Sequence, residues 1–409
     1  MSENVYDVLV QRGYIAQVTD EEGARQLLSR GGVTFYVGFD STASSLHAGS
    51  LVPIMAMMHL QRAGHRPIAL VGGGTTMVGD PSGRTEMRQM LSEGEIRANG
   101  AQIHAQLERY LHFGQGKAIA LDNADWLLPL NYIAFLREIG VHFSVNRMLA
   151  AEAYRQRMER GLSFIEFNYQ LLQAYDYLTL YREYGCTLQM GGDDQWGNIL
   201  AGVDLIRRAE GATVHAMTFP LLTTASGAKM GKSAAGAVWI DGELLHPYDF
   251  YQYWINCDDR DVEQFLRMFT FVPLDEIERL AALEGAEIRQ AKQTLAYEAT
   301  RITHGKEAAQ EAQAAAQAVF GSGGDVDAVP TTGVTADRLK EGIALTTIMA
   351  EVGLSRSRGD ARRMVQQGGA YVNGERISDV NYRVSEADLT AEGILLRAGK
   401  KRYHRLVVG

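Results

Sequence analysis

Residues 33–74 read VTFYVGFDSTASSLHAGSLVPIMAMMHLQRAGHRPIALVGGG. The β-branched and aromatic residues at 33–39 are typical of a strand, and the largely apolar stretch 49–63 is typical of a helix. The continuous apolar run 66–74, which ends in glycines, is the pattern of a strand buried in a parallel sheet. This strand–helix–strand order predicts a doubly wound α/β domain with a parallel sheet.

The remainder of the chain changes character twice. From Asp249 to Phe320 it carries long Ala, Glu and Gln runs typical of helices, and GSGGDVDAVPTTG (321–333) has the composition of a flexible linker. The last part predicts two short helices and a strand that turns at Asn373-Gly374. We therefore expect an α/β domain with an insertion, a helical domain, a linker and a small α+β domain, over residues 1–240 (insertion around 115–165), 241–320, 321–342 and 343–409.

Composition narrows the class of protein. The chain has 409 residues, 46% of them hydrophobic, and two cysteines that lie too far apart to suggest a zinc site or a disulfide framework. No run of about 18 apolar residues occurs, and the first twenty residues carry acids, which a signal or transit peptide avoids. We expect a cytoplasmic protein without a membrane partner.

Charge is distributed unevenly along the chain. The net charge is −9, which argues against simple nonspecific binding of nucleic acid. From Lys340 to the end, however, the chain has 12 Lys and Arg and 8 Asp and Glu, which is a net charge of +4. The rest of the chain therefore has a net charge of −13. This asymmetry predicts a basic appendage on an acidic body.

The segment GFDSTASSLHAGS (38–50) predicts a phosphate site. A strand ends there and a helix begins near His47, and a helix N-terminus offers free backbone N–H groups to an anion. His47 and Thr42 can donate hydrogen bonds to phosphate oxygens, and Gly49 would let a flat ring approach the backbone. An ordinary helix start capped by a histidine explains the same residues.

The segment LTTASGAKMGKS (222–233) resembles a P-loop but is one residue too short between Gly227 and Gly231. Lys229 and Lys232 could instead follow the charge that develops on a reacting phosphate. A solvated Lys-Gly loop is the third interpretation.

The two segments together resemble the signatures of class I aminoacyl-tRNA synthetases known as HIGH and KMSKS. Here they stand as His47-Ala48-Gly49-Ser50 and Lys229-Met230-Gly231-Lys232-Ser233. Ala48 and Ser50 depart from the first signature, and Ser50 lacks the ring donor of a histidine.

Four stretches extend the resemblance to bacterial tyrosyl-tRNA synthetases over nearly the whole chain: YVGFDSTASSLHAGSL (36–51), GDPSG (79–83), FNYQLLQAYDY (167–177) and QMGGDDQWGNI (189–199). The resemblance implies a Rossmann-like catalytic domain, an α-helical domain that binds the anticodon region of tRNA and an αL-type RNA-binding domain. It also implies a homodimer formed through the insertion. The implied substrates are L-tyrosine, ATP with Mg²⁺ held mainly by the phosphates, and tRNA(Tyr), without a tightly bound protein metal.

The resemblance assigns roles residue by residue. The implied tyrosine-binding residues are Tyr36, Asp80, Tyr169, Gln173, Asp176 and Gln195. The implied ATP-binding residues are Asp40, His47, Gly49, Ser50, Gly192, Asp194, Lys229, Lys232 and Ser233. Those expected to stabilise the transition state are Thr42, His47, Lys229 and Lys232. On a helix, Tyr169, Gln173 and Asp176 would share one face, as three convergent polar groups require.

One position departs from the family next to the expected nucleotide site. The family usually has a small hydroxyl residue where this chain has Asp193. A second carboxylate beside Asp194 would repel a nucleotide, so we expect Asp193 to point outward. Arg84 and Arg88 could offset negative charge over ATP or be solvated.

Basic residues at two places suggest tRNA contacts. Arg207 and Arg208 follow the GGDDQWGN motif closely, and SRSRGDARR (355–363) gathers four arginines at a helix start. The candidate tRNA-binding residues are Arg207, Arg208, Arg356, Arg358, Arg362 and Arg363. A solvated basic helix is the alternative.

Three other functions compete with tyrosine activation as interpretations of the sequence. A tryptophanyl enzyme shares the fold but leaves Tyr36 with Asp176 unexplained, and a small-cofactor nucleotidyltransferase has no use for the later domains. A non-catalytic RNA-binding relative would explain Ala48 and Ser50, but not the lysine loop.

Overall fold

The computed structural model describes residues 4–82, 91–150, 154–155, 158, 161–233, 236–320, 330–390, 393–399 and 402–408. The chain divides into two compact units. Unit 1 comprises Met1–Gly231 and Glu263–Ile277, and unit 2 comprises Lys232–Val262 and Glu278–Gly409.

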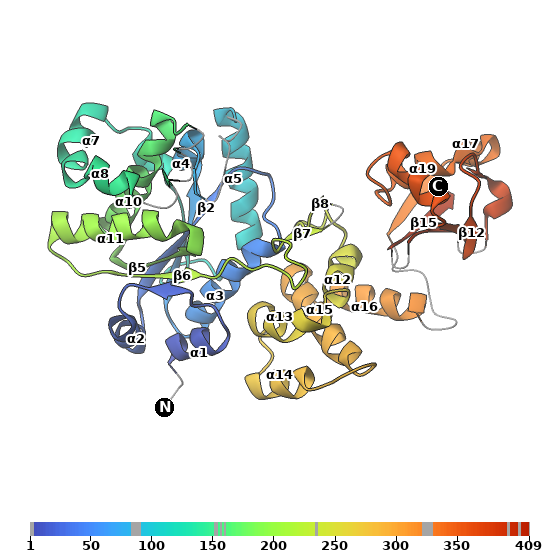
Figure 1. Cartoon of the computed structure of the whole chain (residues 1–409), viewed down its shortest axis with the longest axis horizontal. Helices are drawn as coiled ribbons and strands as arrows, with labels where there is room; N and C mark the ends of the chain where they lie inside the picture. Colours follow the sequence, from blue (N-terminus) through green and yellow to red (C-terminus); the bar gives the residue numbers. More distant parts are fainter. Residues whose placement is uncertain are drawn as a thin grey trace. The chain divides into compact units, whose positions relative to one another are not determined.

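Unit 1 is built on a six-stranded sheet with the strand order β1-β6-β5-β2-β3-β4 (Figure 1). All neighbouring strands from β6 to β4 are parallel, and the short β1 runs antiparallel along β6. Chain order reverses between β2 and β5, which makes this a doubly wound sheet with its switch point there. The strands are β1 (Gln17–Val18), β2 (Thr34–Asp40), β3 (Arg66–Gly72), β4 (Ile119–Asp122), β5 (Cys186–Gly192) and β6 (His215–Phe219).

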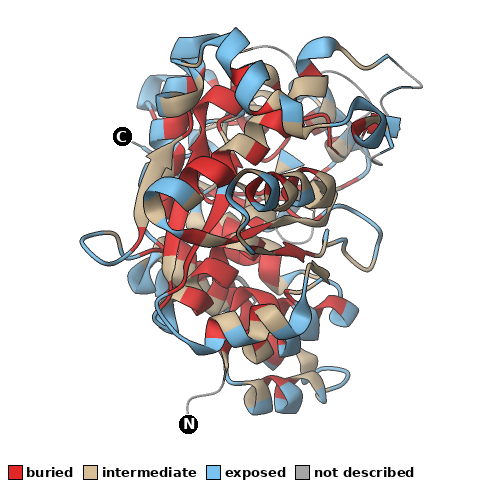
Figure 2. Cartoon of the chain, turned by 90° about the vertical axis from the view of Figure 1, so that its left-hand side faces the viewer, coloured by how far each residue is buried: buried red, intermediate tan, exposed pale blue. Residues whose placement is uncertain are grey.

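Helices cover both faces of this sheet, and the interior between them is buried (Figure 2). Tyr36 of the sheet shares one core with Tyr177 of α10 (Phe164–Tyr184) and Leu205 of α11 (Trp196–Glu210). On the other face, α5 (Glu93–Leu107) approaches closely, because a Cβ on Gly100 would lie 3.0 Å from Val71 Cγ1. Further helices of the unit are α1 (Val5–Gln11), α2 (Glu21–Ser29), α3 (Leu51–Arg62) and α4 (Gly73–Val78).

Local sequence signals start and stop the helix that carries most of the predicted pocket. Ser163 and Glu166 form a capping box, in which each side chain accepts from the other residue's backbone N–H. Gly185 ends α10 in the left-handed conformation, with φ of 63°. The predicted helix that presents Tyr169, Gln173 and Asp176 is therefore confirmed.

The segment 130–150, whose sequence mixes helix and strand signals, is helical. It forms α7 (Tyr132–Glu138) and α8 (Val145–Leu149), with the 3-10 turn η2 (Gly140–His142) between them. Asn131 caps α7 by accepting from Ala134 N. Short helices joined by a tight turn leave several large apolar side chains of this segment exposed.

Unit 2 contains the predicted helices and a separate small sheet. Its helices between Asp249 and Phe320 confirm the helical character expected there: α12 (Pro247–Ile255), α15 (Ile288–His304) and α16 (Lys306–Phe320). α13 (Val262–Phe269) and α14 (Leu274–Ala281) span the points where the two units divide. Across the described ranges, no helix is both long and apolar enough to cross a membrane.

The C-terminal part of unit 2 packs α17 (Ala336–Glu341), α18 (Leu345–Glu351) and α19 (Arg358–Gln366) with a five-stranded sheet of order β12-β11-β14-β15-β9. Asn373 and Gly374, with φ of 49° and 86°, make the predicted hairpin turn between β11 and β12. The strands are β9 (Thr331–Val334), β11 (Ala370–Val372), β12 (Glu375–Ile377), β14 (Ile394–Ala398) and β15 (Arg402–Val408).

The core of this part begins before residue 343. Val334 and Leu339 are buried in it, although both lie inside the range 321–342 that we expected to be a linker. The segment is too short to show the periodicity of a strand or helix in its sequence. The contact of Val334 and Leu339 with the core depends on the pairing of β9 with β15. Residues 321–329 of that range lie outside the described residues.

A buried arginine ties the first helix to the segment 263–277 of the same unit. Arg12 is 6% exposed, and its guanidinium donates to the backbone oxygens of Arg267, Thr270 and Val272 at 3.0, 3.0 and 2.8 Å. Tyr14 adds a bond from its hydroxyl to Met268 O at 2.5 Å. Segments some 250 residues apart in sequence are thus joined by charge-assisted hydrogen bonds.

We predict that Arg12→Met lowers the free energy of unfolding by roughly 3 kcal/mol, because three buried carbonyls lose a charged donor. Urea unfolding of the full chain, followed by tryptophan fluorescence, measures this change. Arg25→Met is the matched control: Arg25 pairs with Asp7 at the surface, and its loss should cost about 0–1 kcal/mol. Equal effects of the two substitutions would refute the role given to Arg12.

Candidate active site

The predicted site residues gather at the switch point of the sheet. Asp40 ends β2 and Gly192 ends β5, and in open α/β sheets ligands bind in the crevice at such strand ends. α10 crosses this edge with Tyr169 and Asp176, both of which are buried. Tyr169 Oη donates to Asp40 Oδ1 at 3.4 Å, which links the helix to the end of β2.

Asp176 is a buried carboxylate held from both sides. Its two oxygens accept hydrogen bonds from Asn123 Nδ2 at 2.9 Å and Trp126 Nε1 at 2.8 Å. Burial raises the pKa of Asp176 to about 7, although the bonds from Asn123 and Trp126 lower it. Such a group can accept a hydrogen bond from one more donor, provided that the carboxyl is ionised.

Two further polar atoms near this carboxylate are buried without a partner in the described part of the chain. They are the hydroxyl of Tyr36 and Oε1 of Gln173. The pKa of the Tyr36 hydroxyl is raised well above its ordinary value, first by burial and then by the charge of Asp176, so it stays a donor. Other buried polar atoms of the described residues also have no partner, but these two belong to the predicted tyrosine-binding residues, where a polar ligand would satisfy them.

A second carboxylate marks the other end of the predicted tyrosine site. Asp80 is 6% exposed and accepts from Ser82 N at 2.9 Å and from Gln195 Nε2 at 2.6 Å. Gln195 in turn accepts from Asn198 Nδ2 at 3.2 Å through its Oε1. A buried carboxylate on this side suits a substrate ammonium group, and the amide beside it suits a substrate carboxylate.

The predicted phosphate element begins with a capped 3-10 turn. His47 is the N-cap of η1 (Ala48–Ser50), and its Nδ1 accepts from Gly49 N at 3.0 Å. The proton of the neutral ring therefore sits on Nε2, which can donate. Thr42, four residues before the buried Leu46, is exposed at the loop. Ser50 makes no side-chain cap bond at the start of α3.

The segment 222–231 forms a small hairpin that lies against this turn. Met230 N donates to Leu222 O at 3.0 Å, Thr223 pairs with Lys229, and Met230 is 6% exposed. A Cβ on Gly231, whose φ is +83°, would lie 2.6 Å from both Gly49 N and His47 Nδ1. Gly49 is tightly packed as well, with Met230 O 3.0 Å from where its Cβ would be. The two glycines thus allow backbone to dock on backbone.

The P-loop interpretation is wrong, because a P-loop wraps the start of the helix that follows it. Here the segment follows β6 and runs into the short strand β7 (Lys232–Ser233), and the next described helix is α12. Lys229 is exposed. The pKa of the Asp194 carboxyl is raised, first by burial and then by the charge of Asp80, and the Lys229 ammonium offsets part of this rise. The side chains of Lys232 and Ser233 are outside the described residues, so their roles stay predictions.

The two aspartates after Gly192 have separate surroundings. Asp194 Oδ1 lies 2.6 Å from where a Cβ on Gly192 would be, so the Asp194 side chain packs against this glycine. Asp193 instead accepts from Gln17 and Thr218, and its direction relative to a nucleotide stays a prediction. Among the described residues, no group of three or more His, Cys, Asp or Glu could hold a metal ion.

Two family profiles together match almost the whole chain. The profile of the class I tRNA synthetases of the tryptophan and tyrosine group matches residues 29–321, and that of the tyrosine–tRNA ligase SYY-like C-terminal domain matches 324–406. The chain belongs to the tyrosine–tRNA ligase family of class I tRNA synthetases.

Individual relatives agree with this membership. The tyrosine–tRNA ligase of Clostridium tetani is 54% identical over 408 residues, which is 100% of both chains. That of Lachnoclostridium phytofermentans is 55% identical over 405 residues, 99% of each. A solved structure of a C-terminally truncated mitochondrial tyrosyl-tRNA synthetase from Aspergillus nidulans superposes with a TM-score of 0.69 at 30% identity, covering 76% of this chain and 92% of that one.

Membership in the tyrosine–tRNA ligase family favours tyrosine activation over the other functions that the sequence allowed. A tryptophanyl-tRNA synthetase from Encephalitozoon cuniculi shares only the fold, with 12% identity and a TM-score of 0.55 over 76% of this chain and 88% of that one. The nucleotidyltransferase hypothesis is wrong, because the matched family is a different one.

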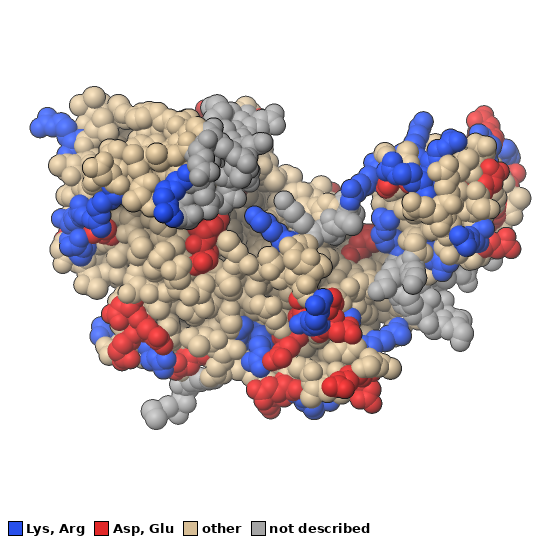
Figure 3. All heavy atoms as spheres, viewed as in Figure 1, with Lys and Arg blue, Asp and Glu red and all other residues tan. Residues whose placement is uncertain are grey.

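The candidate tRNA-binding arginines differ in their ion pairs and in their exposure. Arg208 is engaged within unit 1, where it pairs with Asp204 at 2.8 Å and donates to His142 O at 2.6 Å. Arg207 also bonds Asp204, at 2.5 Å, but stays largely exposed. Around the start of α19 all four candidates are exposed: Arg356, Arg358, Arg362 and Arg363. Lysine and arginine side chains also gather on the visible face of this C-terminal part (Figure 3). Arg84 and Arg88 lie outside the described residues.

Sequence reasoning missed the residues that hold Asp176. Asn123 and Trp126 lie just after β4, and Asn123 also binds Thr75 Oγ1 at 3.0 Å and accepts from Gly74 N at 2.8 Å. Their position after a parallel strand, where site residues collect, was the available signal. Nothing in the sequence indicated that β4 lies beside β3 with its end toward α10.

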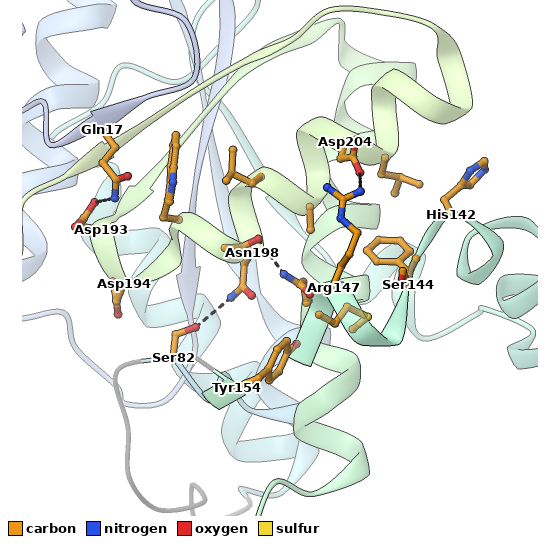
Figure 4. A pocket seen from close by; sticks show the side chains of 18 of the residues that line it. Gln17, Ser82, His142, Ser144, Arg147, Tyr154, Asp193, Asp194, Asn198 and Asp204 are labelled. Carbon is orange, nitrogen blue, oxygen red and sulfur yellow. Dashed lines mark hydrogen bonds and ion pairs between the residues drawn. The ribbon is translucent and has the colours of Figure 1, made fainter. Parts of the chain in front are cut away.

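A cavity of about 700 Å³ adjoins this site along α11 (Figure 4). Asp193, Asp194 and Asn198 line one end, and His142 and Arg147 line the other. The cavity therefore connects the end of β5 with the helical insertion.

The raised pKa of Asp176 gives a pH prediction. If Asp176 binds the phenol of tyrosine, as the resemblance implies, the phenol can donate to it only when the carboxyl is ionised, so kcat/KM for tyrosine should rise with pH and level off above about pH 7. At pH 6 we expect a value about tenfold below the plateau. Tyrosine-dependent ATP–pyrophosphate exchange between pH 5.5 and 8.5 measures it. Asp176→Asn should be low and flat over the same range; a flat wild-type profile would contradict the assignment.

The docking of the hairpin gives a second prediction. Gly231→Ala should slow tyrosyl-adenylate formation by roughly tenfold or more, since the new Cβ displaces the lysine loop from His47. Gly227→Ala is the matched control, because Gly227 has φ of +81° but open space around it. Rapid-quench measurement of adenylate formation compares the two. If they slow the reaction equally, backbone strain rather than docking is responsible.

Proposed function

We propose that this chain activates L-tyrosine with ATP, releasing pyrophosphate, and then transfers tyrosine to the 3′ end of tRNA(Tyr). The observation that carries the proposal is the buried pair at the switch point: an Asp176 carboxylate held by two donors, beside a Tyr36 hydroxyl without a partner. A phenol fits such a pair, because it can donate to the carboxylate and accept from the hydroxyl.

Tyrosine is held at both ends in this proposal. Asp176 and Tyr36 bind the phenol, and Asp80, Tyr169 and Gln173 bind the α-ammonium group. Gln195 lies near the substrate carboxylate, since its side chain bonds Asp80. The enzyme then needs no nucleophile of its own: the substrate carboxylate attacks the α-phosphate of ATP in line, and pyrophosphate leaves.

ATP is assigned to the element that starts at His47 and to the end of β5. Asp40, Gly49, Ser50, Gly192, Asp194 and Ser233 surround the nucleotide in this assignment. Nε2 of His47 donates to phosphate, as its tautomer permits. Thr42, His47, Lys229 and Lys232 stabilise the charge that develops on the phosphates. Mg²⁺ enters with ATP, held by phosphate oxygens.

Transfer to tRNA is assigned to the exposed arginines. Arg356, Arg358, Arg362 and Arg363 present four charges at the start of α19, and Arg207 offers one near the catalytic end. We assign residues 1–240 to catalysis, 241–320 to the anticodon region and the C-terminal part to further RNA contacts. The reaction places the enzyme in the cytoplasm, where translation uses its product.

A homodimer is supported by an apolar surface on unit 1. The helical insertion exposes large apolar side chains, with Ile133 63% and Val141 71% exposed, and the start of α10 adds Phe164 at 70%. Exposed apolar surface of this kind marks a protein interface. We assign it to a second copy of this chain, joined through the insertion around 115–165.

ATP–pyrophosphate exchange with each of the twenty amino acids tests the proposal. We expect exchange with tyrosine, and at least roughly hundredfold less with phenylalanine, because two buried polar groups would lose their partner. Tyr36→Phe should raise the KM for tyrosine about tenfold. Val10→Ala, at an exposed position of α1, is the control without effect. Faster pyrophosphate exchange with tryptophan than with tyrosine, or no exchange with any amino acid, would refute the proposal.

A further inference from the structure

The turn after β5 carries three polar side chains with three different partners. This turn, η3 (Asp193–Gln195), follows Gly192 directly. Gln195 reaches Asp80 at the tyrosine end of the site, and Asp194 packs against Gly192. Asp193 extends toward Gln17 instead, while Asp194 extends in a different direction (Figure 4).

Asp193 fixes the turn to the edge of the sheet. Its Oδ1 accepts two hydrogen bonds, from Gln17 Nε2 at 2.7 Å and from Thr218 Oγ1 at 2.8 Å. Thr218 is fully buried, and its hydroxyl oxygen accepts from Gln17 N at 3.1 Å. Gln17 and Thr218 are also paired in register between β1 and β6, so both donors sit on a rigid sheet edge.

These bonds satisfy one oxygen of a charged group with two donors. The carboxylate of Asp193 therefore joins the turn to β1 and β6.

The other anchor of the turn lies at its far end. Gln195 is held by Asp80 and Asn198, independently of Asp193. The Gln195 side chain also donates to the Asp194 carboxylate, which lowers the pKa of that group against the rise caused by burial. Loss of the bonds at Asp193 would remove one of the two supports of Asp194 and leave both anchors of Gln195 in place. Because Asp194 is assigned to the nucleotide and Gln195 to tyrosine, the two substrates should respond differently.

We propose that Asp193 is a positioning residue for ATP, which holds Asp194 toward the nucleotide by accepting hydrogen bonds from Gln17 and Thr218. The inference rests on the proposed tyrosine activation for the identity of the nucleotide. It is the acceptor oxygen of Asp193, rather than its charge, that the role requires. Asp193→Asn keeps an acceptor in the same place, whereas Asp193→Ala removes it.

The test measures KM for ATP and for tyrosine in pyrophosphate exchange, together with the Kd of ATP alone by calorimetry. Asp193→Ala should raise the KM and Kd of ATP about tenfold while the KM of tyrosine changes less than threefold. Asp193→Asn should restore both ATP values to within threefold of wild type. Gln17→Met should give an intermediate rise, because one donor remains.

A matched control separates positioning from general destabilisation. Asp20 caps α2 at the exposed surface by accepting from Gly23 N, so Asp20→Ala should lower the melting temperature without changing the KM of ATP. An unchanged ATP KM in Asp193→Ala would overturn the inference, as would equal rises for both substrates. A tighter Kd of ATP in Asp193→Asn would also overturn it, since charge repulsion would then be the role. Absence of exchange in wild type would refute the proposed function instead, and the ATP Kd values would still decide the role of Asp193.

Discussion

The site is organised around the buried carboxylate of Asp176. An isolated carboxylate in this position would be neutral at physiological pH, and only the donors Asn123 and Trp126 keep its pKa as low as about 7. Relative to an ordinary aspartate, ionising it in the fold costs about 4 kcal/mol, and this cost grows as pH rises from about 4 to 7. The folded chain carries this cost because an ionised carboxylate without water can discriminate one hydroxyl on a ligand.

Holding such a group requires three segments that are distant in sequence. α10 contributes the carboxylate, the residues after β4 contribute both donors, and β2 contributes the Tyr36 hydroxyl. The parallel order of the sheet brings these together, since the carboxyl ends of β2, β3 and β4 share one edge. Asn123 also bonds Gly74 and Thr75 in the first turn of α4, so the same amide joins the Asp176 carboxylate to the start of that helix.

Several positions in the signature segments have close neighbours in the fold. Ala48 is fully buried in the turn that His47 caps. Gly231 and Gly49 meet backbone to backbone, which no residue with a Cβ could do without displacement. Asp193 has one carboxylate oxygen, Oδ1, that accepts hydrogen bonds from both Gln17 and Thr218.

Sequence alone determined the parts of this protein that depend on local pattern. The alternating and continuous apolar runs predicted β2, α3 and β3. The residues around His47 and Lys229 predicted a phosphate site, and the resemblance to the family implied a phenol at Tyr36 and Asp176. Only the tertiary structure decided what holds Asp176, why position 231 is glycine, and where Asp193 points. Each of these depends on atoms from strands and helices far apart in the chain, and no periodicity or spacing within one segment records such a contact.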